Sequence, residues 1–367
     1  MSSIRFVHTD FLRLGTSVSG LAESPSWLRQ LATGAVRQAV RNVIDLAVSQ
    51  RAGFVLIAGG IVDAGTNPEP ALRWLNEQFE TLRSHGISVV TTADDSETRA
   101  AFSNVFDVVL HPRESLQVTR HASGIVLNKV SQTHRAPGDL LINVGSHNLL
   151  ANDSFVYQAR PSLDASANCS QVSRDSYLSL SAGAVQSVSQ DETQDRGCII
   201  VDADFGKQEL RSQFHACDVL RYRTETITLP GVTAPQSLVS EIVQACESVD
   251  RAATQTVVID WVLQAEFATE LAAVEELNEN RLLSRLRERL HSGHRGIWPR
   301  RITFDESSRL RLASAPTAAV DEYSNQVAEG VHYRSAHTHG SQLSSIQDGT
   351  FVKPDLLCGL TFLSRVA

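Results

Sequence analysis

The chain has 367 residues, with 33 Lys and Arg against 41 Asp and Glu, which gives a formal net charge of −8. Hydrophobic residues make up 42% and charged residues 20%, so a wholly disordered chain is excluded. The acidic balance also excludes a surface that is basic throughout, although a local basic groove for nucleic acid stays open.

The lack of a recognisable targeting or membrane segment, together with the cysteine usage, predicts a soluble, cytoplasmic protein without a membrane partner. The first fifteen residues lack the apolar core of a signal peptide. The longest apolar run, residues 54–62, is shorter than the roughly 20 residues that cross a bilayer. Five cysteines lie far apart without a CxxC pair, which argues against a structural zinc site and suits a reducing compartment.

The amino-terminal third alternates between strand and helix patterns. Apolar side chains at helical spacing predict two helices, the first beginning near Ser24-Pro25-Ser26 and the second closed by Gly86. Such alternation implies right-handed crossovers and a largely parallel sheet. The expected strands cover residues 4–8, 54–58, 87–91 and 106–110, and the expected helices cover residues 26–51 and 69–85.

Beyond about residue 115 the segments become short and strand-like, which predicts a second sheet with loops. Its strands are expected at residues 124–130, 140–144, 177–180 and 197–202. A further α/β unit is expected to contain strands at 224–229, 256–263 and near Ile302, and helices at 236–249 and 268–290. We therefore expect three parts: a main domain over 1–228, a small domain over 229–305 and a weakly patterned tail over 306–367.

Motifs at the predicted strand ends carry a family resemblance. Residues 8–15 read HTDFLRLG, residues 56–63 read LIAGGIVD, and residues 141–147 read LINVGSH. These segments, followed by GAVQSVSQDETQDRGC at 183–198, resemble in order the calcineurin-like metallophosphoesterases of the SbcD/YhaO type, whose first two motifs read HTADLHLG and LIAGDLFD. The resemblance implies an α/β fold, a metallophosphoesterase-like sandwich of two β-sheets flanked by helices, with a small α/β cap domain.

The same resemblance implies a setting for the protein. The family comprises metal-dependent phosphoesterases and DNA-repair exonuclease subunits that work with coiled-coil ATPases. By this resemblance the chain would form a homodimer, and its partners would be DNA or a coiled-coil ATPase of the SbcC type.

The family's metal ligands do not carry over to this sequence. The Asp and His of its first motif fall on Phe11 and Arg13, and its bridging Asp falls on Gly60. The Asn-His pair of its third motif falls on Asp94 and Asp95. The resemblance leaves His147 as a matched histidine. Two metal ions need a shared carboxylate, and an arginine would put a fixed cation at a metal position. We therefore expect a catalytically inactive pseudoenzyme with no cofactor, acting as a scaffold or regulatory subunit.

The alternative is a phosphodiesterase or DNA exonuclease with a remodelled site for one Mn²⁺ or Mg²⁺ ion. Asp94, Asp95 and His147 are its first candidates, together with Asp10 and Asp63. The competing interpretation is structural: Asp10 would cap a turn and Asp63 would cap the helix that follows. A nucleotide-binding function is a weaker interpretation, because no phosphate-loop spacing follows the strand at 54–58.

Arginines in the predicted small domain raise the question of nucleic-acid contact. Arg281, Arg285 and Arg289 recur every four residues, as a phosphate-contacting stripe would require. Arg300 and Arg301 follow, and Trp298 could stack on a base. The competing interpretation, which we favour, is a solvated helix face paired with glutamates and a core tryptophan. His337 and His339 in the tail have metal-ligand spacing but suit surface histidines better.

Overall fold

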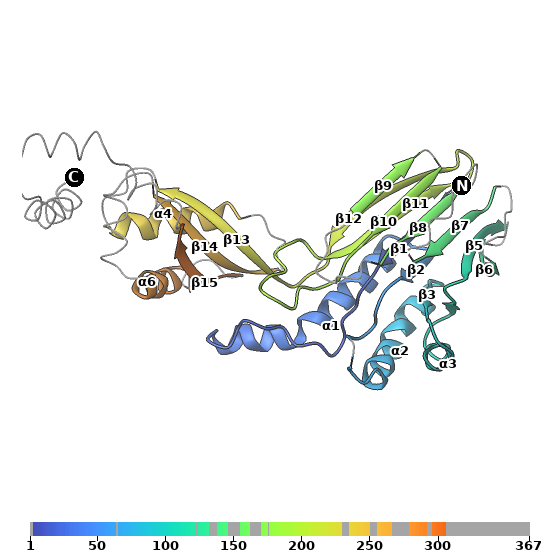
Figure 1. The fold of residues 1–367 in the computed structure, drawn as a ribbon, viewed down its shortest axis with the longest axis horizontal. Helices are drawn as coiled ribbons and strands as arrows, with labels where there is room; N and C mark the ends of the chain where they lie inside the picture. Colours follow the sequence, from blue (N-terminus) through green and yellow to red (C-terminus); the bar gives the residue numbers. More distant parts are fainter. Residues whose placement is uncertain are drawn as a thin grey trace, which may run out of the picture. The chain divides into compact units, whose positions relative to one another are not determined.

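A computed structural model of the chain contains two compact units, each described by itself below (Figure 1). The first comprises residues 1–223 and 252–257, and the second comprises residues 224–251 and 258–367. Within the described residues, no helix is long and apolar enough to span a membrane. The structure describes residues 3–63, 65–121, 124–131, 138–145, 155–161, 170–174, 176–229, 235–249, 255–265, 279–291 and 296–305.

The first sheet of unit 1 has six strands in the order β12-β11-β1-β2-β3-β4. Strands β1 to β4 run parallel, as the alternating pattern predicted, whereas β11 and β12 join antiparallel at one side. Strand β2 is buried along its whole length because the sheet is covered on both faces. The strands are β1 Ser3–Thr9, β2 Phe54–Ile57, β3 Ser88–Thr92, β4 Val108–Leu110, β11 Gly197–Asp204 and β12 Glu209–Ala216.

Three helices pack on one face of this sheet, where they form an apolar core (Figure 1). α1 (Ser26–Ser49) buries one broad stripe, and α2 (Glu69–Ser84) buries Leu75, Phe79 and Leu82 against the sheet and α1. α3 (Ser96–Phe102) adds Phe102 to the same core. The spacing of these apolar residues, three or four apart, explains why the segments fold as amphipathic helices.

The second sheet covers the opposite face of the first and encloses a second core. Phe6 and Phe54 of the first sheet stack at 4.7 Å, and Tyr157 of the second sheet meets Phe6 edge-on at 5.0 Å. The resulting α/β sandwich is the predicted fold class. The second sheet has the order β6-β5-β7-β8-β10-β9, with β5 Glu114–His121, β6 Gly124–Ser131, β7 Leu140–Val144, β8 Val156–Ala159, β9 Ser170–Arg174 and β10 Tyr177–Ser181.

The remaining elements among the described residues are a three-stranded sheet, β13-β14-β15, and helices α4 and α6. The boundary between the compact units falls within the first two of these strands. In unit 2, α4 and α6 pack together, and Leu282, Leu286 and Leu290 form the buried stripe of α6. The elements are β13 Leu220–Leu229, α4 Pro235–Glu247, β14 Thr256–Ala265, α6 Glu279–His291 and β15 Ile297–Phe304.

The strands and helices expected from the sequence are present wherever the structure describes them. One was assigned to the wrong sheet: the strand expected at 197–202 in the second sheet is β11, which pairs with β1 in the first. Other elements were missed. The patterns gave no sign of β5, β8 or β12. The helix cap predicted at Asp63 was wrong, because Pro68 precedes α2. Helix α1 begins at Ser26, as expected, with Pro25 before it. Gly86 does follow the end of α2, with a φ of +70° that suits glycine. The tail with His337 and His339 lies outside the described residues.

Candidate functional site

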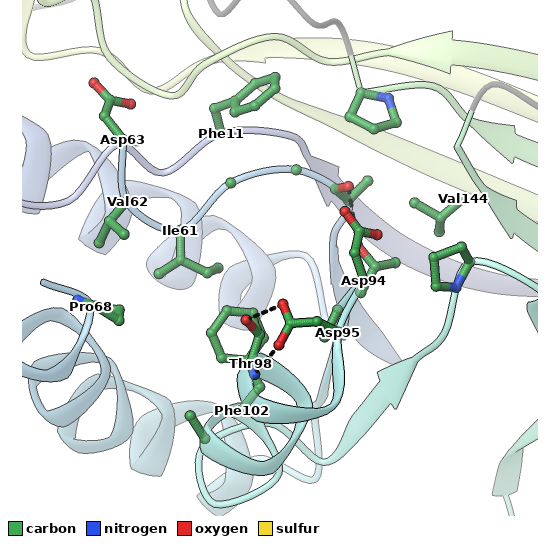
Figure 2. Close-up of a pocket in the computed structure, with 18 of the residues that line it drawn as sticks. Phe11, Ile61, Val62, Asp63, Pro68, Asp94, Asp95, Thr98, Phe102 and Val144 are labelled. Atoms are coloured by element: carbon green, nitrogen blue, oxygen red, sulfur yellow. Dashed lines mark hydrogen bonds between the residues drawn. The ribbon is translucent and has the colours of Figure 1, made fainter. Parts of the chain in front are cut away.

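A pocket of about 770 Å³ opens in unit 1, where parallel strands β2 and β3 end. Ligands in open α/β sheets bind beyond the carboxyl ends of parallel strands, so this is where a site is expected. The lining includes Phe11, residues 58–63, residues 92–95 and Val144 from β7 (Figure 2). The pocket therefore gathers most of the positions at which the family resemblance would place metal ligands.

Phe11 and Gly60 meet on one side of this pocket. The two chain segments are joined by backbone hydrogen bonds, since Leu12 N–H donates to Gly60 O at 3.0 Å. A Cβ atom at Gly60 would lie 3.3 Å from Cδ1 of Phe11, and one at Gly59 would lie 2.8 Å from the Asp10 carbonyl oxygen. The aromatic ring therefore occupies the space that a larger side chain at position 60 would need.

Arg13 is the centre of a charged cluster that borders the pocket. Its guanidinium lies 2.7 Å from Glu192 Oε1 and 3.3 Å from Asp63 Oδ2, and Thr16 Oγ1 donates to Asp63 at 2.8 Å. Arg196 approaches the other Glu192 oxygen at 3.9 Å. The Arg13 backbone has a φ of +53°, uncommon for a residue with a Cβ atom. Two guanidinium groups thus balance two carboxylates at this place.

Three residues before Phe11, the chain forms a second and fully buried polar cluster. His8 Nδ1 lies 2.7 Å from the Tyr157 hydroxyl, and His8 Nε2 lies 2.8 Å from Asp10 Oδ1 without the alignment of a hydrogen bond. Asp10 Oδ2 accepts hydrogen bonds from Ser181 Oγ at 3.0 Å and from the backbone N–H groups of residues 182 and 183 at 2.9 Å. Asp10 thus caps a turn, as its structural interpretation predicted, and ties β1 to the end of β10.

The carboxylates of Asp94 and Asp95 are exposed and do not converge with Asp63 (Figure 2). Asp95 caps α3, because Thr98 donates to it from N at 2.7 Å and from Oγ1 at 2.6 Å. These hydrogen bonds to Thr98 lower the pKa of Asp95 below its ordinary value, since they favour the charged form. No group of three or more His, Cys, Asp or Glu side chains arranged for a metal ion occurs among the described residues. His147 lies outside them.

The sequence pointed to Arg13, Asp10 and Asp63 but missed the other residues of the two clusters. Glu192, Tyr157 and Ser181 come from segments far along the chain, and only the fold brings them to the end of β1. Glu192 lies in the segment 183–198 that carries part of the family resemblance. The sequence offered one signal for this pairing: an acidic residue in that segment, which could pair with the arginine at position 13.

The arginines of unit 2 differ in their exposure to solvent. Arg281, Arg285 and Arg289 are exposed along α6, in the row beside its buried leucine stripe. Arg300 forms a two-pronged ion pair with Asp260, and Arg301 is exposed.

Trp298 is half-buried rather than free to stack on a base. The guanidinium of Arg287 lies 4.6 Å from the centre of its ring, and Arg287 also donates to the carbonyl oxygens of residues 299 and 300 at 3.0 Å. One face of the indole is therefore already occupied by a cation.

Comparison with known proteins gives one distant relationship. No family model matches the chain. The chain is 32% identical over 89 residues to the uncharacterized metallophosphoesterase YhaO of Bacillus subtilis (strain 168). The match covers 24% of this chain and 22% of that protein, so the chain spans well under two thirds of the relative's length. With the α/β sandwich, this similarity supports a relationship to the metallophosphoesterases.

Proposed function

We propose that this chain is a metallophosphoesterase-fold protein without two-metal chemistry, acting as a scaffold or regulatory subunit related to DNA-repair exonucleases of the SbcD type. The observation that carries the proposal is the Arg13 guanidinium, held between Asp63 and Glu192. By the family resemblance, this position would belong to a metal-ligating histidine. A fixed cation there repels a divalent ion, and both nearby carboxylates are already used by the arginine.

The shared carboxylate that a metal pair needs is also missing. Gly60 has no side chain, and a Cβ atom there would lie 3.3 Å from Cδ1 of Phe11. Two metal ions about 3.5–4 Å apart are held together by bridging ligands, which neither residue provides. The donor set around Phe11, Arg13 and Gly60 therefore does not fit the family's metal pair, and no catalytic step is assigned to it.

An assay for phosphodiester hydrolysis tests this proposal. The full-length protein is incubated with Mn²⁺ and either bis-p-nitrophenyl phosphate or single- and double-stranded DNA, beside a His147→Ala variant. The proposal predicts equal, background-level hydrolysis by both proteins. Turnover well above background that is lost in His147→Ala would overturn it and favour the remodelled Mn²⁺ or Mg²⁺ site at Asp94, Asp95 and His147.

We further propose DNA as a partner of unit 2, through the exposed arginines of α6. Four residues of helix rise about 6 Å, so Arg281 and Arg285 present neighbouring positive charges on one face. Each arginine that contacts a phosphate adds to the salt dependence of binding. The coiled-coil ATPase and a second copy of the chain stay as further partner proposals from the resemblance.

Fluorescence anisotropy with a labelled DNA duplex tests the DNA contact. The double variant Arg281→Glu/Arg285→Glu should bind DNA at least about tenfold more weakly, and its binding should depend less on salt concentration. Arg73→Glu is the matched control, because Arg73 is equally exposed on a helix of unit 1 and should leave binding unchanged. Unaltered affinity of the double variant would remove α6 from the proposed interface.

A further inference from the structure

Two buried thiols meet at the start of β11, away from the pocket lining. Cys198 Sγ and Cys217 Sγ lie 3.5 Å apart, and both residues belong to the core beneath α1. Neither is in a disulfide, and they are 0% and 4% exposed. A sulfur–sulfur bond is about 2.05 Å long, so the two atoms need to approach by only about 1.5 Å.

The backbone explains why the sulfurs are so close. Cys198 pairs with His215 in the β11–β12 ladder, and the Cys217 N–H donates to the Arg196 carbonyl oxygen at 2.9 Å just past the strand end. Between them, a Cβ atom at Gly197 would lie only 1.9 Å from the His215 carbonyl oxygen. Only glycine allows this approach of the two strands, which brings the neighbouring cysteines into contact.

We propose that Cys198 and Cys217 form an oxidisable dithiol, which a peroxide converts into an intramolecular disulfide. Cys217 is the slightly exposed member and has its sulfur beside the His215 carbonyl oxygen, so it meets the oxidant first. Cys198 is fully enclosed and acts second, as the resolving thiol. Contact with Cys217 and burial raise the pKa of the Cys198 thiol, which keeps it protonated and unreactive until its neighbour is oxidised.

The chemistry balances with hydrogen peroxide as the oxidant. The Cys217 sulfur attacks one peroxide oxygen, the O–O bond breaks, and the thiol proton leaves with the other oxygen as water. The Cys198 sulfur then attacks the Cys217 sulfenic acid, the S–S bond forms, and the S–O bond breaks to release a second water with the Cys198 proton. The two thiols lose two electrons together, and the peroxide gains them.

The disulfide would fasten an edge of unit 1. β12 is the outermost strand of its sheet, and the bond would join residues 19 apart at the strand's end. Asn42 of α1 already holds this point by donating to the Cys217 carbonyl oxygen at 2.8 Å. Cross-linking constrains the unfolded chain and local opening of the strand, so the oxidised protein is more stable at this edge.

Mass spectrometry on the full-length reduced protein treated with graded hydrogen peroxide tests the proposal. The expected product has lost the mass of two hydrogens, and its peptide map contains a Cys198–Cys217 link that a thiol reductant removes. Oxidation should also slow amide exchange in β12 and raise the thermal midpoint. A folded protein that shows no such link, or that links either cysteine to a different one, overturns the proposal.

Variants separate the two roles. With Cys198→Ala, a sulfenic-acid probe should label Cys217, because nothing resolves the intermediate. With Cys217→Ala, Cys198 should stay unlabelled at the same peroxide dose, and equal labelling of Cys198 would refute the order of the steps. Cys246→Ser is the control, since it removes a buried thiol elsewhere and should leave the 198–217 link intact.

Discussion

The end of β1 builds two polar clusters that differ in burial and in charge. The inner cluster joins His8, Asp10 and Tyr157 in a region without solvent access. The outer cluster joins Arg13 to Asp63 and Glu192 beside an open pocket. Within residues 8–13, His8 and Asp10 thus point into the interior of the sandwich. Arg13 lies beside the pocket, where the family resemblance would place a metal ligand.

The contrast indicates that the polar side chains at the end of β1 stabilise the fold. The inner Asp10 accepts three hydrogen bonds on Oδ2 from the turn after β10, has no solvent exposure and is not part of the pocket lining. The outer Arg13 forms ion pairs with the carboxylates of Asp63 and Glu192, which could otherwise bind a cation. Both clusters are internally paired, which leaves Asp94, Asp95 and their neighbours on α3 as the pocket's accessible acidic groups.

The largest effect is expected from the inner cluster. Asp10→Ala leaves the Ser181 hydroxyl and two backbone N–H groups buried without their acceptor, which should lower the free energy of unfolding by about 3–5 kcal/mol. Urea denaturation measures this loss. Asp94→Ala, at an exposed position, is the control and should change stability by less than about 0.5 kcal/mol. Equal effects of the two variants would contradict the assignment of Asp10 as a structural anchor.

A smaller effect is expected from the outer cluster. Arg13→Met removes the nearest cation from Glu192, which is 6% exposed, and leaves Arg196 at 3.9 Å; it should cost about 2–4 kcal/mol. The matched control is Arg5→Met, which breaks the ion pair with Asp202 on β11. Because the Arg5 and Asp202 side chains are 38% and 44% exposed, that pair should contribute about 1 kcal/mol or less. If both variants lose the same stability, the Arg13 cluster is not a specialised replacement for a metal site.

The smallest effect concerns the cap of α3. Asp95 has a pKa lowered from 3.8 in the folded protein, so its stabilising contribution is present above this unfolded value. It is lost as pH falls through the folded pKa. Asp95→Ala should therefore lower the thermal midpoint slightly at pH 7 and not at strongly acidic pH. Thermal scans across this range check it, and a difference that persists unchanged in acid would speak against the cap.

How far the sequence predicts this molecule depends on how local the signal is. Helices α1 and α2 and strands β1 to β3 follow from spacing within each segment, and Gly86 ends α2 as expected. Strand β12 was missed because it is a mostly polar edge strand, whereas β8 is an interior strand of only four residues, too short for a clear pattern. Strand β5 has only two buried apolar side chains, Leu116 and Val118.

The candidate site divides in the same way. The residue types at positions 11, 13 and 60, on which the proposal of no metal pair depends, could be read from single residues. The pairing of Arg13 with Glu192 could not, because these residues are 179 positions apart and only the sandwich brings them together. Asp63 shows the same limit: a local cap was expected, whereas its partners are Arg13 and Thr16.

Calorimetric titration of the purified protein with Mn²⁺ tests the central claim most directly. We expect no pair of bound ions, because Phe11 fills space beside Gly60 and Arg13 pairs with the carboxylates of Asp63 and Glu192. Binding of two Mn²⁺ ions per chain would contradict this prediction. The contradiction would be strongest if Arg13→His bound neither ion more tightly than the unaltered protein.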